Sequence, residues 1–215
     1  MSLYYKKSIK IRLNIIIFLI IFFNLIFSQN YPNWRDLTKE YETLLSKDPK
    51  NLEILFKLLV IYSAQGRLDR AYDIFKKINS IDPNFLNKKA EEIVEKSNDP
   101  FSLYQIAFAS YFGNKKDKAL TYFQKLYEIF PKDGWIISFL AYLYYEREDI
   151  KETERLINEG LKINNENELL HAIKCVVYYK KGNYILALKE YFTTLGIIQK
   201  KGYREIWELL KSLVY

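Results

Sequence analysis

The 215-residue chain has few of the residues from which catalytic and metal sites are built, with one cysteine, Cys175, and one histidine, His171. A lone cysteine excludes an intramolecular disulfide, so stability must come from packing. A zinc site needs three or four ligands, which this pair does not supply. A catalytic thiol needs a reachable, electropositive surrounding, whereas Cys175 adjoins Val176 and Val177 and is expected inside the protein. We therefore predict no enzyme activity, no metal and no cofactor.

Glycine is also scarce, with 7 residues, and no glycine-rich loop that could cradle a phosphate is present. Neighbouring carboxylates such as Glu152 and Glu154 do not share a helix face, so they are not a paired general acid and base. The formal net charge is +7, but four of these charges lie in the first 12 residues, which leaves +3 for residues 29–215. This remainder disfavours a nucleic-acid partner, and no small-molecule substrate is predicted.

A long hydrophobic run occurs in one place, residues 13–27, where Asn14 and Asn24 alone interrupt the apolar residues. The run follows a basic start and is shorter than the roughly 20 residues of a membrane helix, which is the layout of a secretory signal. We predict that residues 1–28 are a signal peptide, or a membrane anchor if they are not cleaved. Residues 29–215 are then exported to a periplasmic or other extracytoplasmic location, with membrane contact only through an uncleaved 1–28.

The most informative feature of the chain is repetition. The stretch GRLDRAYDIF at 66–75 recurs as GNYILALKEY at 182–191, with Gly first, Ala five residues later and an aromatic residue nine residues later. Fainter copies begin at Asn114 and Glu148, so the four starts are separated by 48, 34 and 34 residues. An insertion of 14 residues after the first copy explains the longer step. The prolines that repeat the spacings of 34 and 48 are Pro49, Pro83 and Pro131.

Apolar residues recur at helical spacing on both sides of each turn, so each repeat is predicted to be a hairpin of two helices. Gly66, Asn114 and Gly182 are residue types that tolerate the left-handed conformation in which helices end. The predicted units are 52–85, 100–133, 134–167 and 168–201.

Three segments outside these units also have helical patterns. Residues 33–47 and 203–214 each carry one apolar stripe and are interpreted as end caps, because a terminal repeat leaves an apolar face uncovered. Residues 84–97 are predicted to form one inserted helix that ends before Asp99 and Pro100.

These features resemble the tetratricopeptide repeat (TPR) family, whose 34-residue units carry this pattern of Gly, Ala, aromatic and Pro. A column of small residues lets the two helices approach, and the next layer is filled by Phe75, Phe123, Ile157 and Tyr191. The small residues are Ala71, Ala119, Thr153 and Ala187. The resemblance implies an all-α fold, a right-handed solenoid of antiparallel helix hairpins, preceded here by an N-terminal hydrophobic helix. It also implies a non-enzymatic module that presents a concave groove to a peptide or partner protein.

A second apolar stripe on the first helices indicates where a partner could bind. Leu103 and Ile106 can serve the core of the second unit, yet Tyr104 and Tyr111 lie on another face of the same helix. Aromatic residues dominate interface energetics, so we predict a partner groove lined by this stripe. Its residues are Tyr104, Phe108, Tyr111, Trp135, Phe139, Tyr142, Tyr145 and Tyr179. The residues predicted to be core are Leu103, Ile106, Leu140 and Tyr144.

Two alternatives remain open for the aromatic stripe. It could be the interface of a self-associating envelope scaffold, or it could be buried against the inserted helix or a cap. Peptides gripped by their C-terminal carboxylate are disfavoured, because Phe56, Val60 and Gln105 stand where the family places Lys and Asn.

Overall fold

The structure is a computed structural model that describes residues 31–95, 99–204 and 206. The chain divides into two compact segments, 1–33 and 34–215, and the second contains the helices of the described residues. The predicted signal or anchor at 1–28 lies outside the described residues, as does most of the predicted cap at 203–214. In the part of the chain that is described, no helix is both long and apolar enough to cross a membrane.

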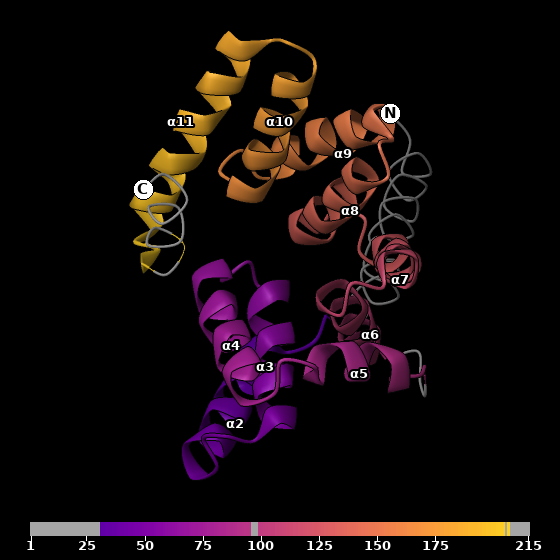
Figure 1. Ribbon diagram of the computed structural model, residues 1–215, viewed down its shortest axis with the longest axis vertical. Coiled ribbons are helices and arrows are strands. Elements are labelled where there is room, and N and C mark those ends of the chain that lie inside the picture. Colours follow the sequence, from indigo (N-terminus) through magenta and orange to yellow (C-terminus); the bar gives the residue numbers. More distant parts are fainter. Residues whose placement is uncertain (1–30, 96–98, 205, 207–215) are drawn as a thin grey trace, which may run out of the picture. The chain divides into compact units, whose positions relative to one another are not determined.

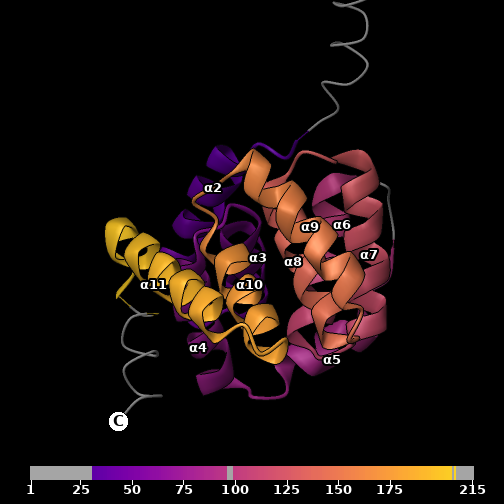
Figure 2. The same ribbon diagram turned by 90° about the horizontal axis from the view of Figure 1, so that it is seen from above.

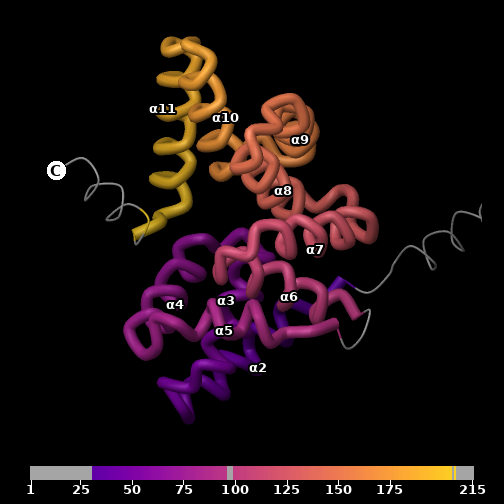
Figure 3. Tube along the Cα trace, turned by 45° about the vertical axis from the view of Figure 1, so that its right-hand side comes forward, coloured from indigo at the N-terminus to yellow at the C-terminus, as the bar shows by residue number. Residues whose placement is uncertain are grey.

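Helices account for the architecture of residues 34–215 in their described part (Figure 1). In chain order they are α2 (Trp34–Lys47), α3 (Leu52–Ala64), α4 (Leu68–Ile81), α5 (Phe85–Glu92), α6 (Pro100–Phe112), α7 (Lys116–Ile129), α8 (Gly134–Glu146), α9 (Ile150–Ile163), α10 (Glu168–Lys180) and α11 (Tyr184–Lys201). The pairs α3–α4, α6–α7, α8–α9 and α10–α11 each fold back on themselves as the first to fourth hairpins, which the tube in Figure 3 makes easy to follow. The fold is therefore an all-α repeat of helical hairpins.

The first helix of every hairpin begins at a polar side chain that caps its amino terminus. The capping residues are Asn51, Asp99, Asp133 and Asn167. In each case a side-chain oxygen accepts a hydrogen bond from a backbone N–H in the first turn, as when Asn167 accepts from Leu170 at 3.0 Å. Such a cap contributes about 1 kcal/mol. The four caps follow one another at the same spacing as the turns, so the repeat sets where the helices start as well as where they turn.

The two helices of each hairpin are joined through a residue with left-handed backbone. The φ angles are +66° at Gly66, +55° at Asn114, +61° at Glu148 and +74° at Gly182. Glycine adopts this conformation freely and asparagine tolerates it, whereas Glu148 holds it at a cost of roughly 1 to 2 kcal/mol. The third hairpin thus departs from the repeat in residue type and keeps its turn geometry.

Helix α5 falls inside the segment 84–97 in which we expected an inserted helix. It packs on α6, the first helix of the second hairpin. At the later junctions this position is taken by the second helix of the preceding hairpin, since α7 packs on α8 and α9 packs on α10. Lys118 on α7 fixes its end, because the Lys118 ammonium donates to the carbonyls of Ala90 at 2.9 Å and Ile93 at 2.8 Å. The inserted helix therefore adds to the contact between the first two hairpins, which also meet directly through α3 and α6.

Helix α2 lies within the predicted N-terminal cap and packs on α3. From its first turn, the Trp34 ring meets Phe101 at 6.1 Å and Tyr104 at 5.0 Å between centroids, both edge-on. The opposite face is polar, with Arg35, Lys39 and further charged residues exposed. This helix therefore closes the N-terminal side of the hairpin array with an apolar inner and a charged outer surface.

A continuous apolar core runs through the hairpins, and most of the predicted core residues belong there. The side chains of Leu103, Ile106 and Leu140 are buried, which confirms the prediction for these three. The small-residue column is also buried, with Thr153 in place of alanine in the third hairpin. Tyr144 differs, because its ring is partly exposed and its hydroxyl accepts a hydrogen bond from Gln124 at 2.7 Å.

Candidate interaction surfaces

Three of the eight predicted groove residues lie in the core instead. Tyr104 and Phe108 are 1% exposed and Phe139 is 4% exposed, so the prediction that they line an accessible groove is wrong. The Trp34 ring covers Tyr104. The Phe108 ring packs edge-on against Phe123 at 5.1 Å and Phe139 at 4.9 Å. The second apolar stripe of α6 is buried because α2 and the following hairpin pack on it.

Trp135, at the start of α8, is engaged within the chain. A Cβ atom added to Gly66 would lie 1.7 Å from the Trp135 indole, so the turn of the first hairpin rests directly on this ring. The Lys201 ammonium stands 5.5 Å from the ring centroid. The Tyr203 hydroxyl donates to the Gly66 carbonyl at 3.0 Å. The first turn, α8 and the end of α11 therefore meet around Trp135.

We name the four remaining predicted groove residues the tyrosine row: Tyr111, Tyr142, Tyr145 and Tyr179. They come from the carboxyl-terminal halves of α6, α8 and α10 and are partly or largely exposed. The rings of Tyr111 and Tyr142 meet at 5.7 Å, and the Lys180 ammonium lies 4.5 Å from the centroid of Tyr145. The row therefore combines partly exposed aromatic surface from three successive hairpins.

Charged groups border the tyrosine row. Lys116 at the start of α7 forms an ion pair with Glu146 at the end of α8. Burial raises the pKa of Tyr142, and Glu146 raises it further, so this hydroxyl stays protonated and can donate a hydrogen bond at neutral pH. Burial likewise raises the pKa of Tyr111. Lys116 also belongs to a hollow of about 790 Å³, to which Arg147 contributes as well.

A second surface, which the sequence did not lead us to expect, lies on α11. We name it the terminal face, and its residues are Tyr179, Tyr184, Ile185, Leu188, Tyr191 and Phe192, each between 41% and 86% exposed. Figures 1 and 2 agree in showing α11 beside α10 at the end of the array. Tyr191 was expected in the layer filled by Phe123, and this expectation is wrong, because no described helix packs on this side of α11 as α8 packs on Phe123.

The interior of the fourth hairpin is more polar than that of the others. Three columns that are apolar in the other hairpins hold His171, Lys174 and Glu190 here. The Glu190 carboxylate, 8% exposed, lies 2.5 Å from Nδ1 of His171 and 2.8 Å from the Lys174 ammonium. The fourth hairpin therefore buries a charged cluster beside its apolar core and leaves apolar side chains of α11 exposed. A comparison of columns could have revealed this, since the positions equivalent to Ile185 hold Asp69, Asp117 and Lys151.

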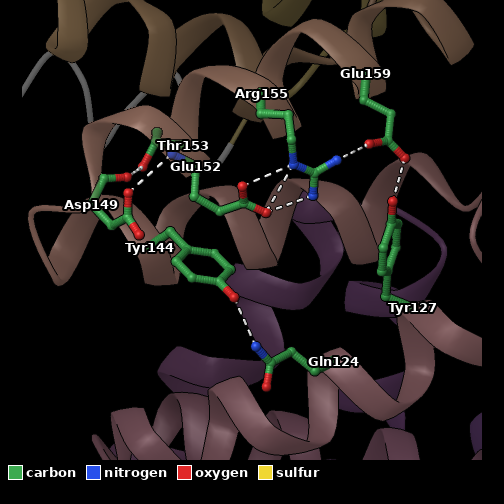
Figure 4. Close-up of polar contacts among 8 residues, drawn as sticks. All are labelled: Gln124, Tyr127, Tyr144, Asp149, Glu152, Thr153, Arg155 and Glu159. Carbon is green, nitrogen blue, oxygen red and sulfur yellow. Dashed lines mark hydrogen bonds and ion pairs between the residues drawn. The ribbon is translucent and has the colours of Figure 1, made fainter.

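Figure 4 shows how a second helix is tied to the hairpin that follows it. Gln124 on α7 donates to the Tyr144 hydroxyl of α8 at 2.7 Å. The Tyr127 hydroxyl donates to Glu159 of α9 at 2.6 Å, and Arg155 also contacts this carboxylate at 2.6 Å. On α11 the positions equivalent to Gln124 and Tyr127 are apolar, namely Phe192 and Leu195.

The ligands of a metal site do not gather among the described residues. Among residues 31–95, 99–204 and 206, no group of three or more His, Cys, Asp or Glu side chains is placed to hold a metal ion. Burial raises the pKa of the Cys175 thiol, and the nearby Glu190 raises it further, which disfavours the reactive thiolate.

Comparison with known proteins adds one sequence relative. The chain is 26% identical over 192 residues to a TPR repeat-containing protein of Methanocaldococcus jannaschii, a match that covers 72% of this chain and 34% of the relative. The chain thus spans about a third of the length of this relative. No protein-family model matches the chain.

Solved structures with similar folds include a crystal structure of MamA, at 20% identity and a TM-score of 0.43, covering 78% of this chain and 90% of MamA. The hetero-tetramer Cut9–Hcn1 of the APC/C also matches, at 15% identity and a TM-score of 0.47, covering 78% of this chain and 30% of that one.

Proposed function

We propose that the protein is a non-enzymatic interaction scaffold that binds a peptide or partner protein on the tyrosine row. The observation that carries this proposal is that Tyr111, Tyr142, Tyr145 and Tyr179 keep accessible surface, whereas other aromatic residues of the same predicted stripe are buried. Tyrosine is enriched at binding hot spots because it offers large contact area with few rotatable bonds. The similarity to a TPR repeat-containing protein supports a scaffold rather than a catalytic role.

The composition of the row indicates what kind of partner fits. Its rings offer apolar contact, and its hydroxyls offer hydrogen-bond donors. The Lys180 ammonium lies over Tyr145, so a cation stands close to the aromatic surface. A partner segment with apolar side chains flanked by carboxylates matches this arrangement.

We further propose that the protein works outside the cytoplasm, with residues 1–28 as its signal or anchor. The basic start and the apolar run at 13–27 support this. Cell fractionation followed by N-terminal sequencing tests it. A mature protein that begins near Gln29 in an extracytoplasmic fraction is the expected result for a cleaved signal. A full-length chain in the cytosol would contradict export.

Binding is tested by quantitative capture from an envelope extract with the fragment 29–215 and two variants of it. Tyr142→Ala and Tyr145→Ala should each weaken capture of the same partner by on the order of 1 to 2 kcal/mol, with the fold unchanged by circular dichroism. The matched control is Tyr72→Ala, which removes a partly exposed tyrosine from α4. Equal losses in all three variants would contradict binding at the row.

The alternative of a self-associating scaffold makes a different prediction for the same variants. If the tyrosine row is an oligomer interface, Tyr142→Ala and Tyr145→Ala should lower the association state in sedimentation, and no other protein should be captured.

A further inference from the structure

The terminal face is continuous along one side of α11. Tyr184, Leu188, Tyr191 and Phe192 follow the i, i+4, i+7, i+8 spacing that aligns residues on a helix, and Ile185 widens the stripe. Tyr179 of α10 joins it, because the rings of Tyr179 and Tyr184 meet at 5.5 Å. The stripe therefore contains several adjoining apolar side chains rather than one stray residue.

The equivalent positions in the second hairpin show what such a stripe contacts. Tyr184, Leu188, Tyr191 and Phe192 correspond to Lys116, Leu120, Phe123 and Gln124 of α7. Phe123 stacks on Phe139 of α8 at 5.3 Å, and Gln124 bonds to Tyr144 of α8. The terminal face is therefore the surface on which a following helix packs, and no helix of the described residues packs there.

The size of the face suits a stable protein contact. The four aromatic and two aliphatic side chains of the terminal face, at their observed exposure, present roughly 600 Å² of apolar surface. This is at the upper end of what a typical monomer exposes in one patch. With its polar rim, the face approaches the roughly 800 Å² that each partner contributes to a standard interface.

Charges around the face favour a copy of the same chain. Three lysines of the fourth hairpin are already paired within the chain, Lys181 with Glu154 at 2.6 Å, Lys200 with Glu166 at 2.5 Å, and Lys201 with Glu168 at 2.6 Å. These three cations are therefore compensated within each copy, and they add no unpaired like charge when two such faces meet.

The other end of the array cannot supply the contact. There α2 presents charged residues such as Arg35, Lys39 and Glu40 to solvent. A head-to-tail stack would bury these charges against the apolar terminal face, which is costly without partners. The arrangement that avoids this cost is a symmetric contact between the terminal faces of two copies.

We propose that two copies of the chain pair through their terminal faces, with α11 antiparallel to α11 and the two-fold axis at Leu188. This register places Leu188 against Leu188, because residues whose numbers are symmetric about 188 oppose each other. Tyr184 then faces Phe192 of the other copy, and Ile185 faces Tyr191. Helix α11 of each copy then covers the terminal face of the other copy.

Sedimentation of the fragment 29–215 tests the dimer, since residues 34–215 form a compact segment of their own. A dimer is expected at micromolar concentration. Leu188→Glu should convert it to a monomer with unchanged circular dichroism and should raise the dimer dissociation constant at least 100-fold. The matched control is Ile163→Glu, which places the same charge at an exposed isoleucine of α9 and should leave the dimer intact.

Cysteine cross-linking in the full-length chain tests the register. Leu188→Cys should form a disulfide-linked dimer under mild oxidation, because the two-fold axis brings the two thiols together. Ile163→Cys should not. Cys175 is present in both variants and therefore cancels in the comparison.

Several results would overturn the proposal. A well-folded fragment that stays monomeric at all concentrations would do so, as would a dimer that persists in Leu188→Glu. Dimerisation only after deletion of residues 207–215 would show that the chain's own tail occupies the face. Binding of the monomer to lipid vesicles, lost in Leu188→Glu, would assign the face to a membrane.

Discussion

Replacing Gly66 by alanine tests the contact between the first turn and Trp135. Two costs arise from the structure. At φ +66° an alanine occupies left-handed backbone at a cost of roughly 1 to 2 kcal/mol. Its Cβ would also lie 1.7 Å from the Trp135 indole, and overpacking of this kind costs typically about 1 to 3 kcal/mol. We expect Gly66→Ala to lower the free energy of unfolding by about 2 to 5 kcal/mol.

Gly182→Ala is the matched control for this experiment. Gly182 has a similar φ of +74°, but nothing lies within 4 Å of the added Cβ, so only the backbone cost of roughly 1 to 2 kcal/mol is expected. Urea unfolding of the fragment 29–215, followed by circular dichroism, measures both variants. Trimming the indole in Gly66→Ala/Trp135→Leu should recover part of the loss. Equal destabilisation by the two alanines would refute the reasoning, since the turn would then not rest on Trp135.

Three further predictions concern the core, a turn and the buried ion pairs. Leu140→Ala should cost about 2 to 5 kcal/mol in urea unfolding, whereas Tyr145→Ala should cost much less, and a comparable loss would place Tyr145 in the core. Glu148→Gly should raise the melting temperature, because it relieves roughly 1 kcal/mol of left-handed strain; a lower melting temperature would contradict this. Burial alone would raise the pKa of Glu190, but hydrogen bonds from Lys174 and His171 outweigh it and hold the pKa below its ordinary 4.5. A depressed pKa gives stability that is present above pH 4.5 and lost in more acidic solution, so acid unfolding should be shallower in Glu190→Gln than in the wild type.

The hairpins could be predicted from the sequence because each depends on local chemistry. The repeated spacing locates the turns at Gly66 and Gly182, and the structure shows left-handed backbone at both. The first helices begin at caps that the same spacing aligns. Even the departure at Glu148 preserves its turn, since the packing of neighbouring helices enforces the conformation.

The surfaces were harder to predict because exposure depends on what packs from elsewhere in the chain. Tyr104 and Tyr145 lie on similar stripes, but Trp34 from α2 covers the first and leaves the second accessible. Helix periodicity does not reveal which stripe is covered. In the fourth hairpin, Tyr191 stands where α8 covers Phe123 in the second, and it is exposed because no described helix packs on that side of α11.

Partner binding by the tyrosine row is open to a sharp test in cells, by site-specific photo-crosslinking of the full-length chain. A benzophenone amino acid at Tyr145 should yield one discrete adduct with another protein, and Tyr142→Ala in the same chain should reduce its yield. The same probe at Tyr72, on α4, should yield no such adduct. An adduct that forms equally from both positions, or an adduct with the mass of two copies of this chain, would contradict a partner-binding tyrosine row.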